Sequence, residues 1–444
     1  MAPYGDAPGR PGNLTAEQEQ RLKDMWISIS EIAGMEHATN GAAPSRASTD
    51  VKPEAGETTP KKKSRFGFGR SKKDKAEEAE GVTNDKHGQT KEYEQALASL
   101  SPEQIREALW LFSKHDDPDA LLLRFLRARK WDVQNAMIMM ISTMHWRLVE
   151  QHVDDDIMLN GEGHAMRESA SSNAAEKKEG EDFMAQLRMG KSFLHGVDKD
   201  GRPCCYVRVK LHRQGEQSEK SLERFTVYTI ETARMMLRPP VDTATIVFDM
   251  TDFSMANMDY TPVKFMIKCF EANYPESLGS VVVYKSPWIF QGIWKIIRGW
   301  LDPVVASKVH FASNVNDLEQ FIPRSQIMKD LGGDEDWTYS YPEPQADEDA
   351  QMKDTATRDK ILAERKELVN SYEQETAKWM HGEDKGEGRT RLAQRLAENY
   401  WKLDPYVRAR SMYDRSNVIQ PGGKLDFYPK SAAPAAASGN DDID

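Results

Sequence analysis

Cysteine is scarce in this chain, and its three cysteines form no recognisable pattern. Cys204, Cys205 and Cys269 have neither the paired spacing of a zinc site nor the even number of a disulfide framework. They are typical of small buried side chains in a protein of a reducing compartment. The ten histidines are scattered without ligand spacing, so we expect no metal site.

Long hydrophobic runs and targeting segments are also missing. No stretch approaches the roughly 18 apolar residues that a bilayer-spanning helix needs. The opening MAPYGDAPGRPG has no apolar core of a signal peptide, and the final residues carry no lipidation motif. We therefore expect a cytoplasmic, monomeric protein whose contact with intracellular membranes is peripheral.

Catalytic signatures are absent as well. The sequence has no GxSxG, HExxH, GxxxxGK or CxxC motif, and GFGRSK at 67–72 lacks the third glycine of a dinucleotide loop. Asp249 follows a hydrophobic strand, where an α/β enzyme can place a catalytic carboxylate, but no partner base is evident and we favour a structural role. The net charge of −11 argues against nucleic acid as the main partner. We expect a binding protein that is not an enzyme and uses no cofactor.

The first third of the chain divides into helical and aperiodic segments. We expect a disordered tail at 1–13, a helix at 14–35 with a capping box at its start, and a helical lobe at 91–150. Residues 36–90 lose all periodicity and are interpreted as a disordered insert. Inside it, KKKSRFGFGRSKKDK at 61–75 carries eight basic residues and is either a membrane tether or a solvated tail.

Strands and helices alternate after a polar stretch at 151–185, which we expect to be a surface connection. Four apolar runs at 204–209, 244–250, 279–285 and 308–312 predict strands, and helices are expected between them. This alternation predicts an α/β domain at 186–340, with a mostly parallel sheet covered by helices. A charged helical extension at 346–430 and a disordered tail at 431–444 follow.

An unusual helix is predicted from Trp288 to Leu301. Its only charges are Lys295 and Arg298. Its aromatic residues are Trp288, Phe290, Trp294 and Trp300. Helix aromatics usually belong to the core, but Trp with neighbouring Lys or Arg also suits a membrane interface. One helix can serve both roles if it belongs to the core when the protein is closed and faces a membrane when the protein is open.

Three segments together resemble one family. LLLRFLRARKWDVQNA at 121–136, HGVDKDGRP at 195–203 and the stretch NYPESLG…WLDPVVASKV at 273–309 are similar to CRAL-TRIO proteins, and more narrowly to their Sec-fourteen-like phosphatidylinositol transfer branch. The resemblance covers about 101–333, with the first helix as part of the same lobe. It implies a lipid-binding fold with a sheet floor, a helical N-terminal lobe and a mobile gate, here the aromatic helix.

The resemblance also implies which residues hold the lipid headgroup. The matching positions are Arg129, Lys130, Glu276 and Lys308. Without the resemblance, we would interpret Glu276 and Lys308 as a structural ion pair. Arg124 and Arg127 are expected to be exposed or paired with acidic neighbours.

Two departures from the family pattern affect the expected ligands. Val305 stands where phosphatidylinositol binders usually have a hydroxyl, and Ala244 and Ile246 stand where phosphatidylcholine binders have hydroxyls. An unmet polar group costs ~1–3 kcal/mol on burial, which disfavours choline lipids. We therefore expect phosphatidylinositol transfer, in exchange with a sterol or isoprenoid, and presentation to lipid kinases. The alternatives are a lipid-sensing scaffold that binds a protein through 346–430 and, less favoured, a lipid hydrolase.

Overall fold

The computed structural model describes residues 4–35 and 85–429. Most of the expected insert at 36–90, including the basic run at 61–75, lies outside these residues, as does the expected tail at 431–444.

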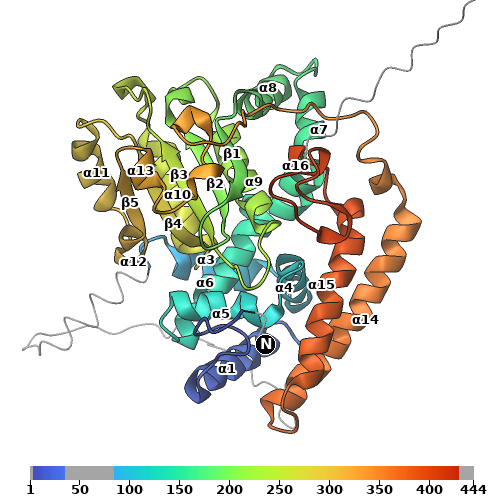
Figure 1. Ribbon diagram of the computed structural model, residues 1–444. Coiled ribbons are helices and arrows are strands. Elements are labelled where there is room, and N and C mark those ends of the chain that lie inside the picture. Colours follow the sequence, from blue (N-terminus) through green and yellow to red (C-terminus); the bar gives the residue numbers. More distant parts are fainter. Residues whose placement is uncertain (1–3, 36–84, 430–444) are drawn as a thin grey trace, which may run out of the picture.

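A five-stranded sheet forms the centre of the fold (Figure 1). The strands, in their order across the sheet, are β1 (Ser192–Val197), β2 (Pro203–Arg208), β3 (Ala244–Asp249), β4 (Leu278–Tyr284) and β5 (Val309–Ala312). β1 and β2 are antiparallel, and the other neighbouring pairs are parallel. The predicted α/β fold with a mostly parallel sheet is confirmed.

The two faces of the sheet have different surroundings. One face is a dry core in which Phe193, Tyr206, Val247 and Val282 pack together. Since side chains alternate between the faces of a strand, the neighbouring residues point to the other face, which borders a cavity. The helices that cover this second face are α9 (Glu219–Arg234), α10 (Tyr260–Lys268) and α11 (Phe290–Arg298).

A helical lobe packs beside the sheet (Figure 1). Its helices are α1 (Ala16–Ile32), α3 (Gln89–Ser99), α4 (Pro102–Ser113), α5 (Pro118–Ala128) and α6 (Val133–His145). Their starts follow local sequence: Thr15 and Gln18 form the expected capping box, and the Asp132 carboxylate accepts the amide of Asn135 at 2.9 Å. Such caps satisfy amides that the first helical turn leaves free.

The N-terminal boundaries differ from those expected. Residues 4–13 do not form a free tail, because Tyr4 is buried and the Arg10 Nε lies 2.8 Å from the Asp242 carboxylate. Residues 89–90, assigned above to the insert, already belong to α3, where Gln89 is buried. Both corrections rest on partners far along the chain, which local composition does not reveal.

The stretch at 151–185 is not a surface connection. It contains α7 (Met158–Glu168) and most of α8 (Ala174–Met189). Within it, Glu162 is fully buried and accepts the hydroxyls of Tyr228 at 2.7 Å and Tyr341 at 2.8 Å, with Arg415 as its cationic partner. Some polar residues of this stretch are therefore paired inside the protein while others, such as Lys177, are exposed, and composition alone does not separate the two kinds.

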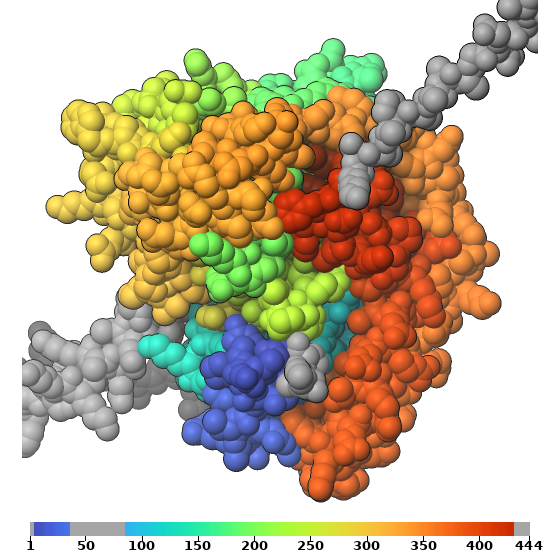
Figure 2. Space-filling model, in the orientation of Figure 1, coloured from blue at the N-terminus to red at the C-terminus, as the bar shows by residue number. Residues whose placement is uncertain are grey.

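The C-terminal extension is part of the main core. α14 (Thr355–Met380) and α15 (Glu387–Val407) form a hairpin on the opposite side of the molecule from α11, and α16 (Met412–Arg415) follows (Figure 1). Figure 2 shows this hairpin beside the N-terminal segment. Tyr372 and Leu396 belong to the same apolar core as Trp26 and Leu109. Because the apolar face of the hairpin is occupied within the chain, a protein partner would have to bind its outward, charged face.

The extension also covers one edge of the sheet. The Tyr413 hydroxyl accepts the amide of Leu194 at 2.7 Å, and the Tyr428 hydroxyl accepts that of Val197 at 3.0 Å. These bonds satisfy backbone donors of β1 that an edge strand otherwise leaves free.

Candidate functional site

An apolar cavity of about 270 Å³ lies between the sheet and the three covering helices. Apolar residues line most of it, among them Val207, Ile246, Phe248, Val281, Phe270 and Met266. The hydroxyls of Thr226 and Thr229 donate to carbonyls of their own helix, each at 2.8 Å, and so offer no free donor to a ligand. The cavity suits long hydrocarbon groups.

One face of α11 forms a wall of this cavity. Phe290, Trp294 and Ile297 line it, followed by Leu301, at the spacing of a helical stripe. The other face also carries apolar residues, which are exposed: Trp288 just before the helix is 85% exposed and Ile296 is 48% exposed. An amphipathic helix that lines the cavity on one side and exposes apolar residues, beside Lys295 and Arg298, on the other is the arrangement expected of a gate.

The four aromatic residues of the predicted gate therefore have different positions. Phe290 and Trp294 line the cavity, and Trp288 points to solvent. Trp300 lies outside α11 and packs edge-on against Tyr260, with ring centroids 5.2 Å apart. The helix itself is shorter than the predicted range of 288–301.

A group of polar contacts ties the end of the gate segment to the helical lobe. One carboxylate oxygen of Glu271 accepts the amide of Asp302 at 2.6 Å, while the other lies 2.6 Å from the Lys86 Nζ and 2.9 Å from the His87 Nε2. Lys86 also donates to the carbonyl of Trp300. Burial favours a raised pKa for Glu271, but the bonds from His87, Asp302 and Lys86 hold that pKa below its ordinary value. We call Lys86, His87 and Glu271 the latch.

Glu276 and Lys308 lie at the amino ends of neighbouring strands, just before β4 and β5. The Lys308 Nζ donates to the carbonyl of Leu278 at 2.7 Å, and Leu278 lines the cavity. In the described part of the chain no ion pair joins Glu276 to Lys308, so the simple structural ion pair is not formed. Both side chains are half-buried at one rim of the cavity.

Arg129 and Lys130 lie at the end of α5. An Arg129 nitrogen donates to the Gln89 side-chain oxygen at 2.5 Å, and Lys130 is exposed. Burial lowers the pKa of Arg129, although the nearby carboxylates of Asp302 and Glu271 oppose that shift. Arg129 is thus a neighbour of the latch. Neither residue, nor Glu276 or Lys308, lines the cavity itself.

Arg124 has a structural position that was not expected. Its guanidinium donates to the backbone carbonyls of Glu276 at 2.8 Å and Asp242 at 2.7 Å, and so ties α5 to the amino ends of β3 and β4. It is half-buried rather than exposed, and its partners are carbonyls rather than carboxylates. Arg127 does have the expected acidic neighbour, because it lies 3.6 Å from Asp242.

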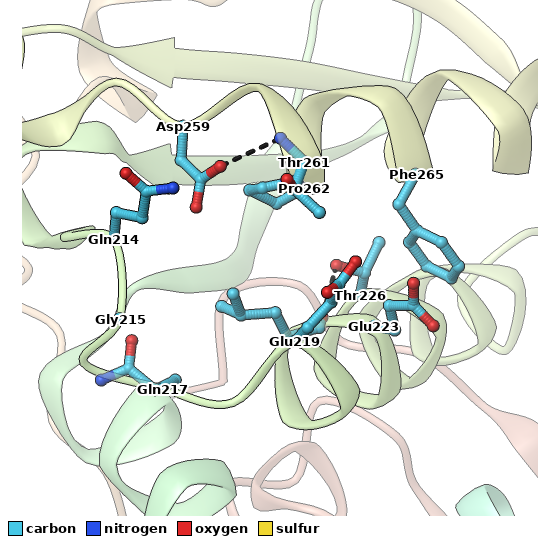
Figure 3. Close-up of a pocket in the computed structure, with 11 residues that line it drawn as sticks. Gln214, Gly215, Gln217, Glu219, Glu223, Thr226, Asp259, Thr261, Pro262 and Phe265 are labelled. Atoms are coloured by element: carbon cyan, nitrogen blue, oxygen red, sulfur yellow. Dashed lines mark hydrogen bonds between the residues drawn. The ribbon is translucent and has the colours of Figure 1, made fainter.

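A polar group at the other end of the cavity escaped sequence reasoning altogether. It comprises Gln186, Lys191, His212, Asn257 and Asp259. Next to it, a cleft of about 190 Å³ opens between the amino ends of α9 and α10, and Figure 3 shows Asp259 there with its bond to the Thr261 amide. The cleft and the cavity share four lining residues, including Asp259 and Pro262. No motif spacing relates these residues in the sequence.

The described residues contain no cluster of three or more His, Cys, Asp or Glu side chains arranged to hold a metal ion. Across residues 4–35 and 85–429, no helix is both long enough and apolar enough to cross a membrane.

Comparison with known proteins identifies two family models in this chain. The CRAL/TRIO N-terminal domain matches residues 89–142, and the CRAL/TRIO domain matches residues 187–333. A CRAL-TRIO domain-containing protein of Schizosaccharomyces pombe is 41% identical over 430 residues, covering 93% of both chains. The phosphatidylinositol transfer protein CSR1 of Eremothecium gossypii is 37% identical over 452 residues, covering 93% of this chain and 99% of that one.

Among solved structures, that of Sfh5 covers 51% of this chain and 74% of its own, with 16% sequence identity and a TM-score of 0.39.

Proposed function

Since this chain belongs to the CRAL-TRIO family, we propose that it binds phosphatidylinositol in its apolar cavity and carries it between membranes. The observation that carries the proposal is the 37% identity, over almost the whole of both chains, to a phosphatidylinositol transfer protein. The bound lipid is a ligand rather than a cofactor, and the proposal includes no catalytic step. The proposal also includes a cytoplasmic location, transient contact with intracellular membranes and presentation of phosphatidylinositol to lipid kinases.

The cavity supports a mechanism in which the acyl chains fill the cavity and the headgroup contacts determine which lipid is bound. Each buried CH₂ is worth ~0.8 kcal/mol against water, but a bilayer already buries the same chains, so their net gain is small. A phosphate at the rim can instead accept charge-assisted bonds from Lys308, Lys130 or Arg129. Lys308 now donates to a carbonyl, and its ammonium has two further donors for a phosphate oxygen.

Exchange requires the gate to move. The volume of about 270 Å³ is just below the ~300–1,000 Å³ typical of ligand pockets. A lipid with two acyl chains therefore needs α11 to swing outward. The exposed Trp288 can contact the membrane as α11 moves outward, because a tryptophan beside basic side chains is stable at a membrane interface.

The second lipid is proposed to be less polar than phosphatidylcholine. Ile246 lines the cavity, and the one hydroxyl in β3, on Thr245, faces away and donates to Asp198 at 2.6 Å. Val305 lines the cavity too, so no hydroxyl meets a choline phosphate at these positions. A sterol or isoprenoid fits this lining. Mass spectrometry of co-purified lipids tests the point, and abundant phosphatidylcholine would refute it.

The headgroup assignment is tested with Lys308→Ala combined with Lys130→Ala. Losing two charge-assisted contacts of ~1.5–3 kcal/mol each lowers phosphatidylinositol transfer by tenfold or more. Transfer of labelled phosphatidylinositol between vesicles measures this, with thermal unfolding as the check on the fold. The matched control is Lys329→Ala with Lys402→Ala, two exposed lysines outside the cavity rim. Equal transfer in the two double variants contradicts the assignment.

A further inference from the structure

Lys191 is a buried amine at the end of the cavity opposite the predicted headgroup residues. It is 6% exposed, and its Nζ donates to the Gln217 side-chain oxygen at 2.6 Å and lies 3.2 Å from the His212 Nδ1. Among the described residues it has no carboxylate within 4.0 Å. Burial lowers the pKa of Lys191 to about 8. A buried ammonium with only neutral partners is costly, so this amine is suited to an oxygen supplied from the cavity.

Gln186 provides a complementary group in the same wall. Its side chain is fully buried, and its Nε2 donates to the Asp182 carbonyl and the Ser221 hydroxyl, each at 3.2 Å. These two acceptors fix the orientation of the amide. Its Oε1 has no hydrogen-bond partner in the described part of the chain. Buried acceptors are rarely left unpaired, so we expect a ligand in the cavity to donate a hydrogen bond to the Gln186 Oε1.

The position of Lys191 is held by a short polar chain. The second nitrogen of His212 lies 3.3 Å from the Asp259 carboxylate, and the other oxygen of Asp259 accepts the Thr261 amide at 3.0 Å. Burial, with Lys191 next, lowers the pKa of His212. The amino end of α10 thus fixes Asp259, Asp259 fixes His212, and His212 in turn contacts the Lys191 amine.

This polar end is separate from the predicted headgroup site. The amide of Arg208, at the carboxyl end of β2, donates to the Lys191 carbonyl at 2.9 Å. Glu276 and Lys308 instead precede β4 and β5, which run parallel to β2 and β3. The two polar groups therefore lie at opposite ends of the parallel strands, about 20 Å apart for strands of six residues.

We propose that Lys191 and Gln186 bind the terminal hydroxyl of a neutral lipid, an alcohol of the sterol or isoprenoid class. A hydroxyl both accepts from an amine and donates to an amide oxygen, so it satisfies both groups at once. A carboxylate would leave the Gln186 Oε1 against a second acceptor, and a hydrocarbon would leave both groups unpaired. The proposal rests on the lipid-binding role of the cavity and names the chemical class of the second lipid.

The experiment compares two ligands on the intact protein. A fluorescent sterol alcohol is bound first, with energy transfer from tryptophan as the signal, and is then displaced by a sterol alcohol or by the same sterol without its hydroxyl. The wild type is expected to bind the alcohol at least tenfold more tightly than the deoxy sterol. Equal affinities overturn the proposal, and this arm needs no variant to fold. Tighter binding of oleic acid than of the alcohol overturns it in favour of an anionic ligand.

The variant arm assigns the effect to the amine. Lys191→Met is expected to remove most of the preference for the alcohol, since only the bond to Gln186 is left, while binding of the deoxy sterol is unchanged. Lys210→Met is the matched control, since Lys210 is nearby, 40% exposed at its side chain and paired with Asp252. An equal loss for both ligands in Lys191→Met indicates a packing defect and overturns the assignment.

The failure of this proposal is distinguishable from failure of the proposed function. Phosphatidylinositol transfer is measured in the same preparations, with the predicted headgroup residues intact. Transfer without preference for the alcohol refutes only the hydroxyl site. A wild-type protein that transfers no phosphatidylinositol refutes the proposed function, whatever its selectivity for sterols.

Discussion

Replacing Glu271 by glutamine tests whether the latch holds the gate closed. The carboxylate side chain is 5% exposed and receives three donors, from Lys86, His87 and the amide of Asp302. Glutamine is nearly isosteric, but it keeps a single acceptor oxygen, loses the charge and turns an amide group towards donors. The change therefore weakens the contact between the lobe and the end of the gate while leaving its shape.

The size of the effect follows from those contacts. Hydrogen bonds to a charged group contribute about 1.5–3 kcal/mol each, and they are not additive within one network. A net loss of ~2–3 kcal/mol from the closed state raises the open population roughly 30- to 150-fold, since 1.4 kcal/mol corresponds to a factor of ten. Lipid transfer becomes faster if opening limits its rate.

Amide hydrogen exchange of residues 288–302 measures the opening directly, because local exchange reports local opening free energy. Faster exchange there, with unchanged exchange in the strands, is the expected result. Lys86→Met removes the same contact from the other side, so the double variant Glu271→Gln with Lys86→Met should show less than the sum of the single effects. Glu319→Gln, at an exposed ion pair, is the control. Unchanged exchange in 288–302 refutes the latch, and equally faster exchange throughout the protein shows a merely structural role.

Two further predictions concern stability and membrane contact. Burial lowers the pKa of His115 to about 3. As the pH falls from 7 to 5, the imidazole is therefore protonated in the unfolded chain but not in the folded protein. The free energy of unfolding falls by about 2 kcal/mol over this range. His115→Phe, which keeps the packing on Trp401, should remove that slope in urea unfolding at the two pH values, and an unchanged slope contradicts the assignment. Trp288→Ala should weaken binding to anionic vesicles by about 2 kcal/mol, or roughly thirtyfold, at constant thermal stability, because this side chain is solvated in the closed state. Leu97→Ala, at an exposed leucine of α3, is the comparison, and equal vesicle binding by the two variants argues against Trp288 as a membrane contact.

Four of the five strands, β2 to β5, were predictable because their signal is local. Apolar runs such as that of β4 are bounded by turns and separated by helical periodicity, and parallel strands buried on both faces require such runs. The helix starts at Thr15 and Asp132 were predictable for the same reason, since the residues that form a cap lie within four positions of one another. The stretch at 151–185 was not, because its buried Glu162 is satisfied by Arg415, more than 250 residues away.

The site divides in the same way. Glu276 and Lys308 were found through a family resemblance, and their adjacency follows from the pairing of β4 with β5. Their headgroup role stays a prediction. Lys191 and Gln186 gave no signal in the sequence, because a lysine before a strand and a glutamine in a charged helix are ordinary surface residues until burial is known.

Local pattern alone was thus enough to specify the strands β2 to β5, the caps, the aromatic character of the α11 segment and the lack of hydroxyls at positions 244 and 246. It did not specify β1, which no predicted strand covers. Tertiary structure decided which face of α11 meets the cavity, that Glu271 ties its end to Lys86, and that the hairpin of α14 and α15 belongs to the core. It also placed a buried amine, that of Lys191, at the end of the cavity opposite the predicted headgroup residues. The physical reason is that periodicity and capping act over a few residues. Burial and the pairing of charges depend instead on partners brought together from distant parts of the chain, and those partners set the cost of each polar group.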